Sequence, residues 1–530
     1  MDEGGICLAN ILDKTPQAGY NGHIISMRLF EEDFFMKRAL ALLCALAMLI
    51  SVAVSCGKAD SGQPSDTTPS TTVNEETTTA QTTPAQTEPP KAFDTVSEEN
   101  LGGYVFNILY TSRDEVYYDF LAETINGDVQ NDAIFQRNAM VEEKLNVDLQ
   151  IAWKELDEVN TVCRMQVQSG TSDFDLFGGH RKSLALSYEG MQYNINDIST
   201  INLSQEWWDQ DYIEAITIHD SLYTVIGDIG VSTLLFISSM TFNKRMLDEA
   251  NIAYPYDLVR EGKWTLDALQ TMLKDQGADL NGDGKMVRED DHFALLGWAT
   301  ESAYSLFYGA DFAFINRDAT GEPQLEYDTD KLNVILEKVV NIWNQDNVYL
   351  YTGSATVPEH EATYAVFAEQ RAMFSDICLC KIGWFYTDME DAYGIVPIPK
   401  LDEAQESYHS YLGFTIPVLF LPANASDPER TGLIMEACSA ASYDVVTPQM
   451  YEIVTKLKNA RDEDSSEMIE IIIRNKFIDT AHFYDIEGYG TLPTNVITSG
   501  SSNSASIIKA FEKIAKKEWD KIITAFDKLS

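Results

Sequence analysis

The stretch Asn131–Gln150 reads NDAIFQRNAMVEEKLNVDLQ and contains two different hydrophobic periods. Ile134, Val141 and Leu145 lie on one stripe at helical spacing, which predicts a helix over Asp132–Leu145. The apolar residues then change to strict alternation. The stretch therefore predicts a helix that is followed at once by a strand.

The residues on either side of this helix extend the prediction. Asn146 suits the left-handed conformation that ends many helices. Val147, Leu149 and Ile151 alternate as in a half-buried strand. Upstream, Tyr104–Tyr110 (YVFNILY) is predicted to be the first strand.

A second helix and a third strand continue the pattern. The helix is expected over Leu156–Gln168 and stops at Gly170, and the short strand Phe174–Phe177 is closed by Gly178 and Gly179. Strand, helix, strand, helix, strand predicts an α/β fold with a mostly parallel sheet. Ligands bind at the carboxyl ends of the strands in such sheets, so the loops after the first and third strands are the first candidates.

The composition limits the class of partner. The chain has 530 residues, 45% of them hydrophobic, and a formal net charge of −45. Such an acidic surface repels phosphate backbones, so we expect no nucleic-acid partner. No G-x-G-x-x-G opens a helix and no G-x-x-x-x-G-K-[ST] occurs, so a nucleotide site has no support.

The N-terminal region carries an export signal. A short positive start, MKR at residues 36–38, precedes the apolar run Ala39–Val54. The run is short for a membrane span and fits a signal peptide over residues 36–55. The ending AVSCG resembles a bacterial lipobox, which implies cleavage before Cys56, lipid attachment to its sulfur, and anchoring to the cell membrane on its extracellular or periplasmic face. An uncleaved N-terminal anchor is the alternative.

Two further N-terminal segments are interpreted from composition. Residues 1–35 look like neither a leader nor a domain, so we interpret them as a mis-assigned start or a disordered extension. Residues 56–95 comprise the lipidated cysteine and a Thr-, Pro- and Ser-rich tether, which has too few apolar residues to fold. We expect this tether to lift the folded part off the membrane.

Four cysteines fall in the folded part. Cys378 and Cys380 are two apart in an apolar run, and an extended chain places them poorly for a bridge. With Cys163 and Cys438 they are expected to be buried free thiols. Four cysteines without paired spacing are weak evidence for a zinc site.

Several segments share their order with one protein family. They are Asn131–Gln150, FDLFGG (Phe174–Gly179), LYTVIGDIG (Leu222–Gly230), MTFNKRMLDEANI (Met240–Ile252), PYDLVREGKWTLDALQ (Pro255–Gln270), AMFSDICLC (Ala372–Cys380) and YGIVPIPK (Tyr393–Lys400). Together they resemble the extracellular solute-binding proteins of bacterial ABC importers, in particular the sugar-binding group similar to family 1. The resemblance covers residue 98 to the C-terminus.

This resemblance implies a two-lobed, type II periplasmic-binding-protein-like fold with the ligand in a cleft between the lobes. The N-terminal lobe would comprise 96–238 plus 368–412, and the C-terminal lobe 239–367 plus 413–530. Ala372–Cys380 would be the strand that returns to the first lobe. Ligand would stabilise the closed form, which would then dock on the permease subunits. Hinge crossings are expected near Phe236–Phe242, Tyr364–Arg371 and Tyr411–Ile416.

Aromatic residues beside polar ones are candidates for sugar contacts, because they can cover the apolar faces of sugar rings. Trp207 and Trp208 are adjacent, so one of them is able to face the cleft. Trp298 ends a predicted strand and Glu301 lies just beyond it. Trp384 lies soon after the predicted strand within Ala372–Cys380. Packing in the lobes is the alternative for each tryptophan.

Four polar residues complete the candidate contacts. Asp376 lies inside an apolar strand, where a charge is costly unless it is paired. A ligand contact and a buried ion pair are both open for it. His180 and Arg181 follow the third strand, and Asp228 follows a glycine in a similar position. A solvated loop is the alternative for these three.

An acidic loop matches a calcium-binding pattern. Asp279, Asn281, Asp283 and Asp290 occupy positions 1, 3, 5 and 12, and Lys285 offers its carbonyl at position 7. Position 12 is Asp instead of the usual Glu, which predicts weak affinity. We expect a structural Ca²⁺ ion and no other cofactor, with an acidic turn held by Asx geometry as the alternative.

The sequence therefore predicts a monomeric, membrane-anchored binding subunit of an ABC importer that captures a carbohydrate, foremost an oligosaccharide. No enzymatic activity is expected. A surface glycan-binding lipoprotein without a transporter remains an alternative. So does an extracellular glycan-active enzyme that uses paired carboxylates, although no G-x-S-x-G or H-E-x-x-H motif occurs.

Overall fold

The computed structural model describes residues 91–112, 119–120, 122–353, 358–413, 416–455, 463–500 and 505–529. They belong to one compact unit, Thr87–Ser530. Residues 1–35, the predicted signal peptide 36–55 and Cys56 lie outside the described residues, as does the predicted tether before residue 91. Within the described ranges, no helix is long and apolar enough to cross a membrane.

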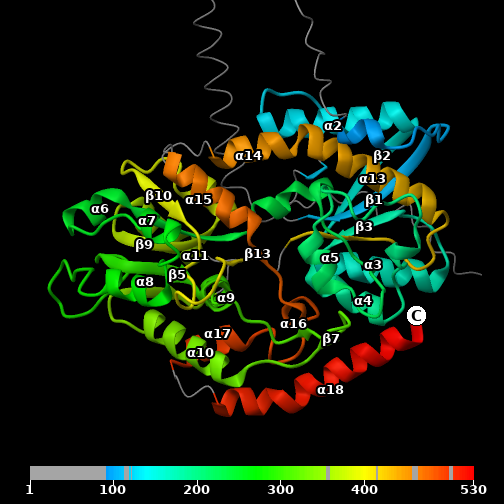
Figure 1. The fold of residues 1–530 in the computed structure, drawn as a ribbon. Coiled ribbons are helices and arrows are strands. Elements are labelled where there is room, and N and C mark those ends of the chain that lie inside the picture. Colours follow the sequence, from blue (N-terminus) through cyan, green and yellow to red (C-terminus); the bar gives the residue numbers. More distant parts are fainter. Residues whose placement is uncertain are drawn as a thin grey trace, which may run out of the picture. The chain divides into compact units, whose positions relative to one another are not determined.

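A four-stranded sheet with the order β12-β3-β1-β2 forms the first lobe (Figure 1). β1 (Tyr104–Thr111) pairs in parallel with β2 (Val147–Lys154) and with β3 (Leu176–Gly179). β12 (Val418–Phe420) joins the edge of β3 in the antiparallel direction. The predicted α/β fold with a mostly parallel sheet is confirmed.

The two predicted helices of this lobe form as their sequence signals indicate. α2 (Val129–Leu145) begins at Asp128, whose side chain accepts from a backbone amide, and ends at Asn146 with φ 49°. α3 (Leu156–Ser169) ends at Gly170 with φ 72°. The other helical segments associated with this lobe are η2 (Ala92–Thr95), η4 (Arg181–Leu184), α4 (Ala185–Tyr188), η5 (Ile195–Asp197), α5 (Gln210–Ile216), η6 (Asp228–Leu234), α13 (Pro428–Val445) and α14 (Thr447–Thr455).

A five-stranded sheet with the order β10-β4-β9-β5-β8 forms the second lobe. β9 and β8 run parallel to β5, whereas β4 is antiparallel to β9 and to β10. The strands are β4 (Ser238–Asn243), β5 (Phe293–Trp298), β8 (Val348–Tyr351), β9 (Ala372–Cys378) and β10 (Tyr393–Val396). The helices of this lobe are α6 (Lys244–Glu249), α7 (Tyr256–Arg260), α8 (Leu266–Leu273), α9 (Ala299–Gly309), α10 (Thr329–Trp343), α11 (Pro358–Ala368), α12 (Leu379–Phe385) and α15 (Glu463–Arg474).

One of the predicted lobe segments is wrong, and a second is wrong in part, because α15 and α17 do pack in the second lobe. Residues 368–412 were expected in the first lobe, but β9 and β10 pair inside the second sheet. Residues 413–530 were expected in the second lobe, but β12 pairs with β3 and α13 packs on α2. An apolar strand such as β9 is buried on both faces and fits the centre of either sheet, so its sequence does not say which partner strands it will meet.

The hinge crossings follow from these pairings. The chain leaves the first lobe between η6 and β4, close to the predicted Phe236–Phe242, and returns between β11 (Ser410–Tyr411) and β12, close to the predicted Tyr411–Ile416. The crossing expected at Tyr364–Arg371 is wrong, because α11 and β9 both pack in the second lobe. A third crossing lies between α14 and α15, since α15 packs against β10.

The C-terminal segment contacts both lobes. β13 (Lys476–Phe477) pairs with β11. α16 (Thr480–Phe483) packs on α5 of the first lobe, α17 (Leu492–Ser499) packs on α9 and α10 of the second, and α18 (Ala505–Leu529) packs on α4. In Figure 1 the red helix α18 runs beneath both lobes. A short ladder of β6 (Asn316–Arg317) and β7 (Pro323–Gln324) completes the described strands.

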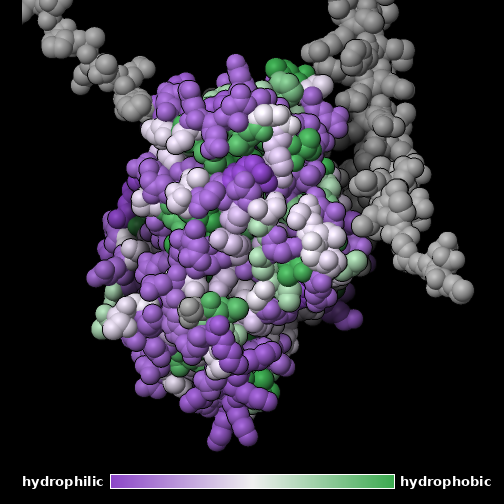
Figure 2. Space-filling view, turned by 90° about the vertical axis from the view of Figure 1, so that its right-hand side faces the viewer, coloured by the Kyte–Doolittle hydropathy of each residue, from purple (hydrophilic) through white to green (hydrophobic). Residues whose placement is uncertain are grey.

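The folded part begins earlier than predicted. η2 falls inside the predicted tether, and its Phe93 is buried with its backbone amide bonded to Asp444 at 2.9 Å. On the face shown in Figure 2, hydrophilic side chains dominate and apolar ones form small separate groups. This surface agrees with the net charge of −45.

Candidate ligand-binding site at the hinge

A small cavity lies where the crossing segments meet one edge of the second sheet. β9 runs parallel to β5 and antiparallel to β4, so the ends of β5 and β9 and the start of β4 share this edge. It is the carboxyl edge of the parallel strands, where α/β proteins bind ligands. The cavity is lined by Phe236, Ser238, Glu301, Asp376, Cys378, Tyr411 and Gly413.

The cavity is narrow in this conformation. It measures about 20 Å³, which is room for about one water molecule. A larger ligand does not fit the cavity in this conformation. The lining residues come from both crossing segments and from β4, β9 and α9, so the cavity lies where the two lobes are connected.

Asp376 is the most unusual residue of the cavity. It is 1% exposed and pairs with Met240 in the middle of the sheet. Its Oδ2 has no hydrogen-bond partner among the described residues. Burial raises the pKa of Asp376 to about 7, and the nearby hydroxyl of Ser305 opposes this rise only in part. Asp376 therefore offers a buried acceptor to any donor that enters the cavity.

Serine hydroxyls surround this carboxylate. Those of Ser302 and Ser305 lie near enough to Asp376 to oppose the rise of its pKa, while the Oγ atom of Ser238, in the cavity wall, is buried without a hydrogen bond inside the described ranges. Buried polar groups are almost always bonded, so Ser238 is a further group that a polar ligand could satisfy. Gly297 makes the arrangement feasible, because a Cβ there would lie 2.2 Å from the hydroxyl of Ser302.

An ion pair forms a second polar part of the wall. Lys381 Nζ donates to Glu301 Oε1 at 2.5 Å and lies 4.9 Å from the centre of the Trp298 ring. Tyr364 donates to the other carboxylate oxygen of Glu301 at 3.3 Å. Burial alone would lower the pKa of Lys381, but Glu301 and the adjacent thiols outweigh it and raise the pKa. The ammonium therefore stays charged and largely neutralises Glu301.

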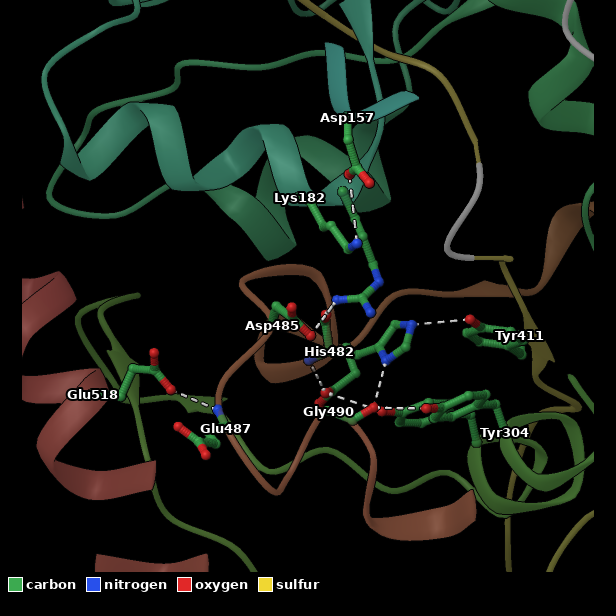
Figure 3. A network of polar contacts seen from close by, with 12 residues as sticks. Asp157, Lys182, Tyr304, Tyr411, His482, Asp485, Glu487, Gly490 and Glu518 are labelled. Carbon is green, nitrogen blue, oxygen red and sulfur yellow. Dashed lines mark hydrogen bonds and ion pairs between the residues drawn. The ribbon is translucent and has the colours of Figure 1, made fainter. Parts of the chain in front are cut away.

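Tyr411 joins the cavity to the C-terminal segment (Figure 3). His482 Nδ1 lies 3.1 Å from the carbonyl of Gly490, and His482 Nε2 lies 2.9 Å from the Tyr411 hydroxyl. A carbonyl only accepts, so Nδ1 carries the proton and Nε2 accepts from Tyr411. Tyr304 donates to the same Gly490 carbonyl at 2.8 Å. Burial holds the pKa of His482 well below its usual range, which keeps the ring neutral.

The same network reaches the first lobe through Arg181. Its guanidinium donates to Asp485 Oδ1 at 2.6 Å and to the carbonyl of His482 at 3.1 Å. Arg181 follows β3, whereas Tyr411 and Tyr304 belong to the hinge and to the second lobe. Segment 479–490 therefore contacts both lobes through this network (Figure 3).

The tryptophan candidates separate into buried and exposed residues. Trp207 and Trp208 are 5% and 1% exposed in the first lobe, and Trp208 Nε1 donates to Glu436 at 2.8 Å. These contacts support the packing alternative for the pair. Trp298 is buried beside Lys381, and Trp384 lies within α12 and is 52% exposed. A ligand contact by Trp298 or Trp384 stays a prediction.

The polar candidates lie in two places. Glu301 and Asp376 line the same cavity. His180 directly precedes η4 and donates its backbone amide to the hydroxyl of Ser183 at 3.2 Å, while Arg181 contacts Asp485. Asp228 accepts from the hydroxyl of Thr447 at 2.9 Å. The structure thus gathers two predicted contacts and leaves the other three in the first lobe and its junction with the C-terminal segment.

Sequence reasoning missed most residues of the site, among them Ser238, Tyr411 and Lys381. Ser238 and Tyr411 lie next to hinge crossings, and only the pairing of the sheets shows that they face the same cavity. Lys381 carried a usable signal, because a lysine inside the apolar run CLCKIGW requires a partner. Its partner, Glu301, is 80 residues away in the chain.

The predicted calcium loop is held together by its own backbone. Asp279 accepts from the amides of Gly282 and Gly284, each at 2.7 Å, and Asn281 accepts from the amide of Asp283 at 2.9 Å. No three acidic, histidine or cysteine side chains gather as metal ligands anywhere in the described part of the chain. The Asx-turn alternative thus describes the hydrogen bonds that are present, and calcium binding stays a prediction.

Comparison with known proteins supports the fold. The described lobes are similar to a cyclo/maltodextrin-binding protein solved with maltotetraose, at 14% identity over 79% of this chain and 98% of that one, with a TM-score of 0.51. The GacH receptor of Streptomyces glaucescens, solved unliganded and with acarbose, is similar at 12% identity over 78% and 99%, also with a TM-score of 0.51. These likenesses establish the two-lobed binding-protein fold.

Sequence comparison is less informative. No protein-family model matches the chain. The ATP-dependent phosphoenolpyruvate carboxykinases of Staphylococcus aureus strains are 25% identical over 235 residues, which is 43% of this chain. The chain spans 39% of the length of these curated relatives. A match of this extent assigns neither fold nor activity.

Proposed function

We propose that this chain is the substrate-binding subunit of an ABC importer, anchored outside the cell membrane by a lipid on Cys56. It would capture a carbohydrate, foremost an oligosaccharide, between its two lobes and deliver it to a permease as a monomer. The observation that carries the proposal is the hinge cavity with the unpaired buried oxygen of Asp376. The sugar ligands in the structures of similar fold support the same ligand class.

The chemistry of the cavity suits a sugar. Asp376 and the hydroxyl of Ser238 can bond to sugar hydroxyls, and the rings of Phe236 and Tyr411 can cover apolar ring faces. Glu301 is already paired with Lys381, so Asp376 is the principal acceptor left for the ligand. A neutral, donor-rich molecule satisfies these groups without adding negative charge to an acidic protein.

Capture would operate by a shift of population. A ligand that touches both lobes only when they are closed stabilises the closed form by that difference in contacts. The two crossings at the cavity wall make the site sensitive to closure. The closed form would then be the form that a permease recognises.

A thermal-shift screen of Thr87–Ser530 against mono- and oligosaccharides tests the proposal. A ligand at about a hundred times its dissociation constant should stabilise the protein by roughly 2.7 kcal/mol. The Asp376→Asn variant should lose most of that shift. Peptides or polyols that shift melting in place of sugars would contradict the ligand class. No shift from any compound would contradict the proposed capture of small ligands.

Two further measurements separate the alternatives. Product formation from glycans would indicate an enzyme. Binding to a polymer without lobe closure, followed by small-angle scattering, would indicate a surface lipoprotein that works without a transporter. One-to-one binding with closure is the result expected here.

We propose separately that the loop from Asp279 to Asp290 binds a structural calcium ion. Its carboxylates already hold the loop in a series of turns, and outside the cell calcium is abundant enough for a weak site.

A further inference from the structure

Cys378 and Cys380 lie closer together than their spacing in the sequence suggests. Their sulfur atoms are 2.7 Å apart. On a continuous strand, residues two apart are separated by about 6.6 Å between Cα atoms, near the upper limit for a disulfide. The chain is not extended here, because β9 ends at Cys378 and α12 begins at Leu379. This turn brings the two side chains together. The expectation that Cys378 and Cys380 lie on one extended strand is therefore wrong.

The distance between the sulfur atoms distinguishes the chemistries open to two thiols. A disulfide bond measures about 2.05 Å, so closure requires a shift of only about 0.65 Å. Two thiolates on one tetrahedral metal, with bonds of about 2.3 Å, would be separated by about 3.8 Å. The observed 2.7 Å is far below that value and also shorter than ordinary contact between two sulfur atoms. The geometry therefore favours a bond between the sulfurs over a shared metal.

The position of the pair connects it to the ligand site, and a reagent larger than water can reach it only if the lobes part. Cys378 lines the hinge cavity, while Cys380 lies behind it at 6% exposure. Asp376 is two residues before Cys378 and Lys381 directly follows Cys380. Any covalent link across this turn would fix the spacing of the two charged groups that the cavity uses.

We propose that Cys378 and Cys380 are a redox site that forms a reversible disulfide in the wall of the ligand cavity. The inference rests on the proposed function in one respect, namely that the oxidising compartment outside the membrane allows such bonds to persist. The oxidised turn would hold Asp376 and Lys381 in place and favour ligand binding.

The oxidant belongs to the class of disulfides. The thiolate of Cys378 attacks one sulfur of the reagent, forms a mixed disulfide and expels one thiolate. The thiolate of Cys380 then attacks the Cys378 sulfur and expels the second. The two cysteines lose two electrons and two protons, and the reagent is reduced to two thiols. Burial raises the pKa of Cys380, so the second step is expected to be faster when the lobes are open.

Peptide mapping of the full chain tests the bond directly. The chain is incubated with oxidised glutathione, denatured in excess iodoacetamide and cut with trypsin. Cleavage after Arg371 and Lys381 gives one peptide, Ala372–Lys381, that contains both cysteines. It should be unalkylated and lighter by two hydrogen atoms. Cys163 and Cys438, in other peptides, should be alkylated, and prior reduction should expose all four.

Three results would overturn the proposal. They are alkylation of both Cys378 and Cys380 without reduction, a glutathione adduct that stays on Cys378, and a bridge from either residue to Cys163 or Cys438. The Cys380→Ser variant should trap the adduct on Cys378, which shows that exchange begins there. These measurements need no sugar, so their failure leaves the proposed capture of carbohydrate intact.

The effect of the disulfide on ligand binding is tested by comparing the sugar affinity of the oxidised and the reduced chain. The sugar found in the thermal-shift screen should bind the oxidised chain about five-fold more tightly than the reduced chain, the lower end of typical coupling between sites. Reciprocally, that sugar should make the disulfide harder to reduce by the same factor. A Cys163→Ser/Cys438→Ser chain is the matched control and should keep the response. Equal affinity in both redox states would overturn the effect on the ligand site.

Discussion

Each lobe contains a fully buried aspartate, and the two differ in how their oxygens are bonded. Asp119 of the first lobe accepts from the amide of Ser232 at 2.8 Å, from its hydroxyl at 2.6 Å, and from Tyr110 at 2.9 Å. Asp376 of the second lobe has an oxygen without any partner in the described ranges. Burial raises the pKa of both groups, to about 6 for Asp119 and about 7 for Asp376.

The difference indicates two roles for the same side chain. Asp119 belongs to a network in which Arg137 donates to its carbonyl and to that of Ile229, so it holds the chain before the hinge in place. Asp376 takes part in no comparable network of hydrogen bonds within the described residues, and it lines the cavity. A buried carboxylate whose oxygens are all hydrogen-bonded has a structural role. A buried carboxylate with an oxygen left unbonded is a candidate for binding a hydrogen-bond donor of a ligand.

The largest expected change is the loss of stability when Asp119 is replaced. Asp119→Ala leaves the Tyr110 hydroxyl and both Ser232 donors unpaired in the core, which should lower the free energy of unfolding by about 5 kcal/mol. Asp376→Ala, in ligand-free protein at neutral pH, should not lower it, because the variant removes a carboxylate whose charged form is destabilised by burial. Urea denaturation of both variants measures the contrast. Similar losses in the two variants would remove the distinction between the two carboxylates.

The pH dependence of stability should come next in size. An unfolded aspartate titrates near about 3.9, and Asp376 when folded titrates at about 7. Between these values the folded state binds more protons, so the free energy of unfolding falls as pH rises. Below about 3.9 both states are protonated and this penalty is absent. Above pH 7 it is constant, at about 4 kcal/mol.

Asp376→Asn should remove this contribution and flatten the slope, as followed by urea unfolding from pH 4.5 to 8. Asp119→Asn should change the slope less, because the pKa of Asp119 rises only to about 6. If the slope of Asp376→Asn equals that of the parent chain, Asp376 is not the buried acid described here.

Ligand affinity provides a third contrast. Asp376→Asn should weaken binding of the sugar found in the screen by about ten- to a hundred-fold, since a hydrogen bond to a charged group contributes about 1.5–3 kcal/mol. Asp119→Asn, if it folds, should bind within about two-fold of the parent chain, because additivity holds for separate sites. Isothermal titration calorimetry distinguishes the two. Unchanged affinity in Asp376→Asn would exclude it as a ligand contact.

The smallest expected effect concerns the acidic loop. Calcium at millimolar concentration, bound with a dissociation constant of about 10⁻⁴–10⁻³ M, should stabilise the protein by about 1 kcal/mol. Excess chelator should lower the melting temperature and calcium, but not magnesium, should restore it. The Asp283→Asn variant should melt as the chelated protein does. A melting temperature that does not change when chelator is added would contradict the calcium proposal.

Local order was predictable from the sequence wherever local chemistry decides it. The helix that ends at Asn146 and the strands around it follow from periodicity and from the left-handed stop. Pairing between distant strands was not predictable. The same apolar run in β9 fits either sheet, and only backbone hydrogen bonds to β4 and β5 place it in the second lobe.

The site shows the same division. The sequence by itself marked Asp376, because a charged residue amid apolar ones is costly unless it is paired, and Glu301, because it lies just beyond Trp298 at the end of a predicted strand. It also determined the acidic character and the α/β class. The tertiary structure alone decided that these two residues share a cavity, that Lys381 neutralises only one of them, and that a turn brings Cys378 to Cys380. Each of these facts depends on contacts between segments far apart in the chain, or on a local turn that neighbouring elements impose, and neither leaves a trace in residue spacing.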